Sequence, residues 1–184
     1  MINFIFRLFL TFNSTSLIIV VFMVKEQYII LSLYDRFPNI PDFISYLIYF
    51  SVPVIFTFLS LLMSKWLDSD SVEPIGKESA VLEIEQANNA FLPSYLGYFF
   101  VALSVPYFET LIFVFAILFV FTFLSQTLYF NPLFLLYRYH FYYLTTSNKT
   151  KIFLISKKKL KNPNNIKLPL LKRINNFTFI DKEN

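Results

Sequence analysis

Four stretches of apolar residues dominate the chain and limit what it can fold into. They cover about residues 4–24, 43–63, 90–105 and 107–130. A helix needs roughly 20 mostly apolar residues to cross the hydrocarbon core of a bilayer. Only 15% of the 184 residues are charged and 56% are hydrophobic, whereas about a quarter of the residues of a soluble domain are charged. The sequence therefore predicts an integral membrane protein with four transmembrane helices.

Pro106 separates the last two stretches. Proline disfavours the helical conformation of the residue before it and lacks a backbone donor, so we expect a tight reversal and a helical hairpin. Glu109, the only charge in the fourth stretch, follows directly. An ionisable residue inside a membrane often serves as a proton or cation relay. In the first turn of a helix, however, Glu109 fits better as a carboxylate at the water interface.

Lysine and arginine residues are unevenly distributed around these stretches. Fourteen of them lie on the side that holds the N-terminus, the loop 64–89 and the tail, whereas only Lys25 and Arg36 lie on the other side. Because basic loops stay in the cytoplasm, we expect a multi-pass protein of a bacterial inner membrane with both termini in the cytoplasm. If the first stretch were a cleaved signal peptide, three spans would remain, but no small-x-small cleavage site follows Val24.

Two segments do not look like membrane spans. The loop Leu67–Asn89 carries six acidic residues, and its residues 79–85 alternate towards their end between apolar and polar, which suits a strand or an extended entry into the third helix. Tyr139–Ser156 has aromatic and β-branched residues on both sides of a polar turn, which predicts a β-hairpin. Residues 157–165, rich in lysine, asparagine and proline, are expected to be exposed and loosely ordered.

The predicted fold class is therefore all-α integral membrane, with four transmembrane helices and a small cytoplasmic β-hairpin-like extension. Residues 1–136 form the transmembrane domain, including the cytoplasmic loop 64–89. Residues 137–184 form a basic cytoplasmic tail.

Several residue types that carry chemistry are scarce. The chain has no cysteine, one histidine (His140) and two glycines. These counts exclude a disulfide framework, a thiol nucleophile and a multi-histidine metal site within one chain. They also leave no glycine-rich phosphate loop. We therefore predict no catalytic residue, no metal and no cofactor, and we expect that the protein is not an enzyme.

Three segments carry a family resemblance. They are Leu82–Phe99 (LEIEQANNAFLPSYLGYF), Phe130–Leu135 (FNPLFL) and Lys151–Ser156 (KIFLIS). They lie within residues 72–158, and this region resembles the KwaA family, the membrane subunits of the Kiwa anti-phage defence system; the first half of the chain matches by hydropathy alone.

The resemblance implies a small four-span inner-membrane protein that senses infection and works with a cytoplasmic DNA-binding partner, KwaB. It also implies self-association, with a tetramer as the expected state. The chain departs from the family pattern in the tail turn, where we expect a glycine but find Ser147-Asn148-Lys149. Asparagine tolerates the left-handed conformation that such a turn can require.

A polar cluster at the entry to the third stretch is the candidate partner-binding surface. In the alternative interpretation it is a solvated helix start, where acidic residues favour the positive end of the helix dipole. Its members are Glu83, Glu85, Gln86, Asn88 and Asn89.

Basic residues beyond the fourth stretch are candidates for the membrane interface. Arg138 and His140 either read lipid headgroups, with His140 as a pH sensor, or anchor the chain beside an aromatic belt. The run Lys157, Lys158 and Lys159 can face DNA, acidic protein or anionic lipid, and lipid attraction is the simplest of these. No aromatic residues are interleaved with the run as a stacking platform, so we expect no direct nucleic-acid binding.

The polar run Asn13–Ser16 in the first span either lines a pore or joins helices by hydrogen bonds, which is the commoner use of small polar residues in membranes.

Together these observations predict a non-enzymatic membrane sensor and scaffold that recruits a KwaB-like effector. A small oligomeric channel or transporter is the alternative, but the sequence has no internal repeat and few charges at membrane depth. A membrane enzyme and a pore-forming lysis protein are further alternatives.

Overall fold

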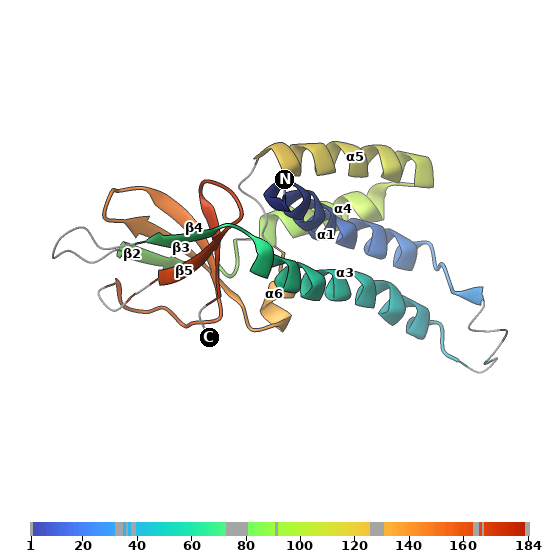
Figure 1. Ribbon diagram of the computed structural model, residues 1–184. Coiled ribbons are helices and arrows are strands. Elements are labelled where there is room, and N and C mark those ends of the chain that lie inside the picture. The colour runs from blue at the N-terminus through green and yellow to red at the C-terminus, as the bar shows by residue number, and fades with distance from the viewer. Residues whose placement is uncertain are drawn as a thin grey trace.

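The chain folds into a helical part at one end and a β-sheet at the other (Figure 1). The computed structural model describes residues 2–31, 35, 37, 40–72, 81–90, 92–125, 131–163, 166 and 168–182. The helices are α1 (Ile2–Lys25), α3 (Phe43–Met63), α4 (Leu92–Ser104), α5 (Phe108–Ser125) and the short α6 (Leu133–Leu136), and the 3-10 helix η1 (Ser64–Trp66) extends α3.

Among the described residues, three helices are long and apolar enough to cross a membrane, namely α1, α3 together with η1, and α5. The prediction of four spans is wrong because α4 has only 13 residues, or about 20 Å at 1.5 Å per residue, against a hydrocarbon core of about 30 Å. Residues 126–130, at the end of the expected fourth span, lie outside the described residues.

The expected helical hairpin at Pro106 is present. Helix α4 ends at Ser104 and α5 begins at Phe108. The reversal lies at the end of the helical part that is remote from the sheet, where Lys25 Nζ donates a hydrogen bond to the carbonyl of Val105 (2.7 Å). A cation thus satisfies a carbonyl that the turn leaves without a helical partner.

Helix α1 is the central helix, because it packs against α3, α4 and α5. Its polar run is buried and holds the helices together. Tyr95 of α4 donates to the carbonyl of Ser14 (2.8 Å). The amide of Asn13 lies 2.8 Å from Thr57 Oγ1 of α3. The Asn13 amide is oriented so that its nitrogen faces an acceptor and its oxygen faces donors. In this orientation Asn13 donates to the carbonyl of Pro53 (3.1 Å) and accepts from Asn131 (2.9 Å). The prediction that this run joins helices agrees with these contacts.

The described residues also form a six-stranded mixed sheet, so the prediction of an all-α protein is wrong. Its strands are β1 (Ser69–Val72), β2 (Val81–Gln86), β3 (His140–Thr146), β4 (Lys151–Ser156), β5 (Leu168–Arg173) and β6 (Thr178–Asp181). The order is β1-β5-β6-β4-β3-β2. All neighbours are antiparallel except β4 and β6. The predicted hairpin is present as β3 and β4, but it is the middle of a larger sheet built from both the loop and the tail.

The middle strands of the sheet are buried on both faces. Side chains alternate between faces along a strand, and the near-continuous apolar run of β4 suits a strand that is covered on both sides. One face of β3 and β4 packs with Phe6, Leu10 and Leu61 at the ends of α1 and α3. The opposite face packs with residues from β2, β5 and the segment before β5. The first of these clusters joins the sheet to the helical part.

The turn between β3 and β4 places its left-handed residue at Lys149 (φ 60°), not at Asn148. The turn is closed by hydrogen bonds from Lys149 N to the carbonyl of Thr146 (2.8 Å) and from Thr146 N to the carbonyl of Thr150 (3.0 Å). A left-handed residue with a Cβ costs about 1–2 kcal/mol, so the position at which glycine is favoured is residue 149.

We predict that Lys149→Gly stabilises the protein by about 0.5–1 kcal/mol. The free energy gained when the strain of the left-handed residue is removed exceeds the cost of the greater backbone entropy that glycine loses on folding. Lys149→Ala is the control, because it removes the same charge but keeps the strain. Thermal unfolding in detergent checks the prediction, and an equal gain from both variants would contradict it.

We predict that Asn13→Leu destabilises the helical part by about 1–2 kcal/mol, because the side chain that links α1 to α3 and Asn131 is lost. Ser51→Ala is the matched control, since Ser51 Oγ bonds only to the carbonyl of Ile48 in its own helix (2.7 Å). Unfolding by titration with a denaturing detergent measures the difference. Equal stability of the two variants would show that the cluster does not hold the helices together.

Candidate functional site, a lysine-lined pocket

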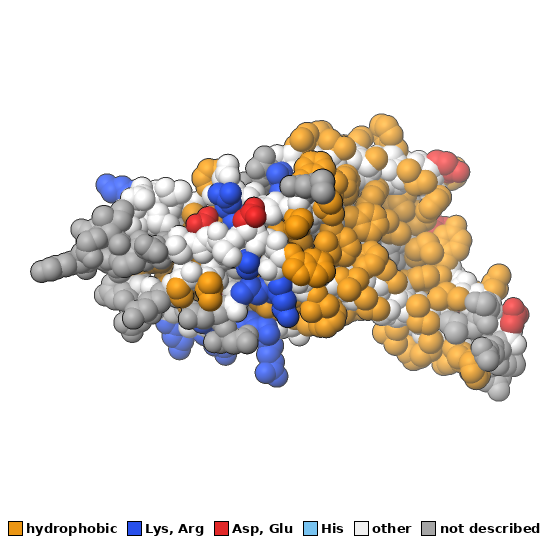
Figure 2. All heavy atoms as spheres, viewed as in Figure 1, with side chains coloured by type: hydrophobic (Ala, Val, Ile, Leu, Met, Phe, Trp, Pro, Cys, Tyr) orange, Lys and Arg blue, Asp and Glu red, His pale blue; other side chains and the backbone are white. Residues whose placement is uncertain are grey.

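A pocket of about 500 Å³ opens where the end of α3 meets the sheet. Figure 2 shows that lysine and arginine side chains gather beside this boundary, between the hydrophobic helical part and the more polar sheet. The pocket is lined by Phe58, Leu61, Leu62, Lys65, Tyr137, Tyr139, Lys157, Asp181 and Lys182. We call it the junction pocket.

Three lysines from separate elements converge on the junction pocket. Lys65 lies in η1, Lys157 follows β4 and Lys182 follows β6. The ammonium of Lys182 donates to the carbonyl of Leu61 in the last turn of α3 (2.9 Å), where the helix dipole favours a cation. Lys157 Nζ and Lys182 Nζ lie 5.2 and 5.8 Å from the ring centroid of Tyr139, within the range of cation–π attraction.

Burial at this position lowers the pKa of Lys182 from 10.5 to about 8. Burial of the ammonium is the largest cause, followed by repulsion from Lys65 and Lys157. The pKa of Lys182 is lower in the folded protein than in the unfolded chain. Deprotonation of Lys182 therefore increases the free energy of unfolding as the pH rises from about 8 to 10.5. At neutral pH Lys182 is charged, and an anion in the pocket would relieve the repulsion among the three lysines.

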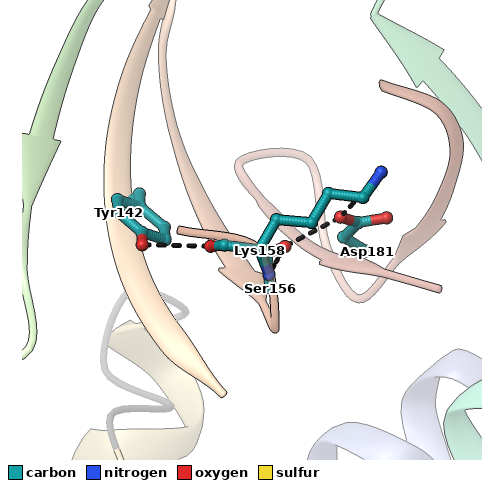
Figure 3. Close-up of polar contacts among 4 residues, drawn as sticks. All are labelled: Tyr142, Ser156, Lys158 and Asp181. Carbon is teal, nitrogen blue, oxygen red and sulfur yellow. Dashed lines mark hydrogen bonds and ion pairs between the residues drawn. The ribbon is translucent and has the colours of Figure 1, made fainter. Parts of the chain in front are cut away.

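A hydrogen-bond network fixes the start of the lysine run (Figure 3). Ser156 Oγ donates to the buried carboxylate of Asp181 (2.7 Å) and accepts from the backbone N–H of Lys158 (3.0 Å). Tyr142 donates to the carbonyl of Lys158 (3.0 Å), and Lys158 Nζ lies 3.9 Å from Asp181 Oδ2. Lys157 and Lys159 are exposed, as predicted, but the backbone of the run is tied to β3 and β6.

The wall of the pocket towards the helices is apolar. Phe58, Leu61 and Leu62 come from the last turns of α3. Tyr137 is held against the same helix by a hydrogen bond from its hydroxyl to the carbonyl of Val54 (3.0 Å). The pocket therefore has a cationic half on the sheet and an apolar half on a helix of membrane-crossing length. Tyr139 lies against the cations, and its burial, with repulsion from Asp181 second, raises the pKa of its hydroxyl.

The predicted partner-binding residues lie on a different edge of the molecule. Glu83, Glu85 and Gln86 belong to the edge strand β2 and are exposed. Glu85 pairs with Lys151 across the neighbouring strand (3.2 Å), and Glu83 accepts from the hydroxyl of Thr145 (3.3 Å). The segment is thus a strand and not a helix start, so the helix dipole does not explain these acids.

Asn88 and Asn89 have different roles from the acids. Asn88 accepts from the backbone N–H of Phe141 (2.8 Å), and its amide nitrogen lies 3.0 Å from His140 Nδ1. These contacts extend the pairing of β2 with β3 into the turn before α4. Asn89 is exposed in that turn. Four of the five candidates are therefore exposed, whereas Asn88 contributes to the fold.

The remaining candidates do not form one site. Arg138 is exposed in the turn after α6 and has a positive φ of 63°. Glu109 is exposed in the first turn of α5, at the end remote from the sheet. In the part of the chain that the structure describes, no group of three or more histidine, cysteine, aspartate or glutamate side chains is placed to hold a metal. The three lysines of the junction pocket, in contrast, converge in a way that suits an anion.

Lys65, Asp181 and Lys182 line the pocket but are not among the site residues predicted from the sequence. The pair Lys65-Trp66 directly after an apolar helix is typical of a membrane interface and could have indicated Lys65. Asp181 and Lys182 follow the alternating segment Phe177–Ile180, which suits a short strand. Nothing in the sequence places this segment beside the end of α3.

A comparison with known families now identifies the chain. A family model described as anti-phage protein KwaA matches residues 6–180. The chain belongs to the KwaA family. The match confirms the resemblance and extends it over the first half of the chain. No curated protein and no solved structure matches the chain. Membership of the KwaA family implies a role in anti-phage defence.

We predict that Lys65→Met raises the pKa of Lys182 above about 8, because it removes the largest charge repulsion acting on that ammonium. The measurement is an NMR titration of carbon-13 methylated lysines, with the Lys182 signal assigned from Lys182→Arg. Lys161→Met is the control, since Lys161 is exposed and outside the junction pocket. An unchanged Lys182 titration in Lys65→Met would contradict this account of the pocket.

Proposed function

We propose that this KwaA-family protein is a non-enzymatic sensor and scaffold of the bacterial inner membrane that recruits a cytoplasmic, KwaB-like DNA-binding effector. The observation that carries the proposal is the division of the molecule into an apolar helical part and a sheet on one side of it (Figure 2). Large hydrophobic side chains are exposed along α3 and α5, and such an apolar surface needs lipid or another protein to cover it.

The position of the N-terminus supports a cytoplasmic sheet. Asn3 at the start of α1 donates to Asp68 (2.9 Å) and to the carbonyl of Arg173 in β5 (3.2 Å). The N-terminus, the loop and the tail, which carry most of the basic residues, thus lie at the same end of the helical part. This arrangement favours the orientation that the positive-inside rule predicts.

Scaffolding accounts better for the polar residues of α1 than conduction does. Asn13 and Ser14 bond to neighbouring helices of the same chain, so they are used in packing. Helix α5 has only 11% of its span buried, which leaves most of its surface for lipid or for a second copy of the chain. We include assembly as a homo-oligomer, with a tetramer as the expected state, in the proposal.

The effector surface that we propose is the exposed edge of β2 with its carboxylates Glu83 and Glu85. An edge strand offers unpaired backbone groups for pairing. Two carboxylates on it attract a basic partner, and a DNA-binding protein carries basic surface. Acidic residues on an edge strand also discourage two copies of β2 from pairing with one another.

We predict that Glu83→Lys weakens co-purification of the DNA-binding subunit of the same Kiwa system by about tenfold or more, because like charges brought together at an interface are costly. The effect should shrink at high salt, since screening shortens the range of charge interactions to about 3 Å at 1 M. Affinity purification in mild detergent at low and high salt measures it.

The matched control is Asp70→Lys, the same charge reversal on β1 at the opposite edge of the same sheet. Gel filtration must show unchanged assembly for both variants. A cysteine placed at Lys161, in a chain that otherwise has none, reports the side of the membrane by labelling in spheroplasts. Equal effector binding by the two variants would move the docking surface away from β2, and labelling from the periplasm would overturn the proposed orientation.

A further inference from the structure

The junction pocket lies at the level where α3 would leave the bilayer. Lys65 and Trp66 directly follow the apolar helix, and Trp66 is 70% exposed. Tryptophan and lysine are typical of the water–lipid interface, where an indole ring or a long cationic side chain reaches the headgroup region. Phe58 and Leu62, which line the helical side of the pocket, are 48% and 41% exposed.

The charges in the pocket are unbalanced. Lys65, Lys157 and Lys182 line it together with a single carboxylate, that of Asp181. This carboxylate already accepts from Ser156 (2.7 Å) and lies 3.9 Å from Lys158. The three ammonium groups therefore retain an excess of positive charge that faces an open cavity.

We propose that the junction pocket binds the phosphate headgroup of an anionic phospholipid from the leaflet that faces the sheet. The proposal rests on the membrane location proposed above. Three lysines from three elements suit the several oxygens of a phosphate, for which charged donors give the strongest hydrogen bonds. The Tyr139 ring and the hydrogen bond to Leu61 hold Lys157 and Lys182 in place before the ligand arrives.

The apolar wall favours a lipid over a soluble phosphate. A free phosphate has no apolar group that could cover Phe58, Leu61 and Leu62. The glycerol and the upper acyl chains of a phospholipid, in contrast, would cover these side chains where the lipid continues along α3. Lipid attraction of this kind is worth about 1 kcal/mol for each basic residue near the surface. If the pocket binds a headgroup, the position of the sheet would also depend on the lipid composition of the membrane.

Trp66 is the only tryptophan in the chain and directly follows Lys65, so its fluorescence reports lipids near the end of α3, beside the pocket. The full-length protein is reconstituted in phosphatidylcholine nanodiscs that contain a minor fraction of phosphatidylglycerol with brominated acyl chains, which quench tryptophan. The same fraction of brominated phosphatidylcholine gives the reference. We expect stronger quenching by phosphatidylglycerol, with a half-saturation about tenfold lower than for the neutral lipid.

The test variant is Lys65→Gln with Lys157→Gln, which keeps Lys182 and its bond to α3. The matched control is Lys159→Gln with Lys161→Gln, which removes the same charge from exposed positions outside the pocket. The test pair should lose the preference for phosphatidylglycerol, and the control pair should keep it. Equal loss in both pairs would show that general attraction to the tail suffices and would overturn the proposal.

Two further arms separate the possible sources of phosphate and the possible causes of failure. Added glycerol phosphate should not relieve the quenching; full displacement by it would assign the pocket to a soluble phosphate and overturn the lipid proposal. A protein that stays in the bilayer and recruits its effector, yet shows no lipid preference, would refute the headgroup site alone. A protein that leaves the membrane fraction in carbonate washes would refute the proposed function itself.

Discussion

Polar side chains that are buried between apolar helices must find partners within the protein, and the buried Asn13 does so for three segments at once. It joins α1 to Pro53 and Thr57 of α3 and to Asn131. Asn131 also accepts from the backbone N–H of Leu133, the first residue of α6 (3.0 Å). The point where the chain leaves its helices and enters the sheet is therefore fixed by a side chain near the middle of the first helix. These contacts act together with the hydrophobic cluster of Phe6, Leu10 and Leu61 against β3 and β4, which joins the sheet to the helices.

Local patterns in the sequence were sufficient to locate α1, α3, α4 and α5 and one hairpin, but not the short α6. The apolar run 43–63 coincides with α3, the alternation near residue 85 became β2, and the aromatic segment around Tyr142 became β3. These elements follow from periodicity within a single segment. The length of α4 was overestimated because the apolar character continues on both sides of it, and hydropathy alone does not mark where β2 and its turn end.

The other strands depend on pairing between distant segments. Strand β1 (SDSV) is short and polar, and it is a strand because β5 lies beside it. Strand β6 has four residues and pairs with β4 in parallel, an arrangement that no local pattern indicates. The junction pocket was missed for the same reason, since Lys65 and Lys182 are far apart in sequence and meet only after β6 is in place. By contrast, the acids of β2 are only two positions apart in the sequence and were therefore easy to find.

The position of β6 has a consequence for the synthesis of the protein. The strand is formed by residues 178–181 but lies in the interior of the sheet, between β4 and β5. A ribosome translating this chain has thus made all the described helices before the last strand of the sheet is complete. Until then β4 exposes an apolar edge, and unpaired strand edges of this kind are prone to aggregate. The helices are therefore complete before the sheet can form, and removal of a few residues near position 180 would leave the helical part without a complete sheet.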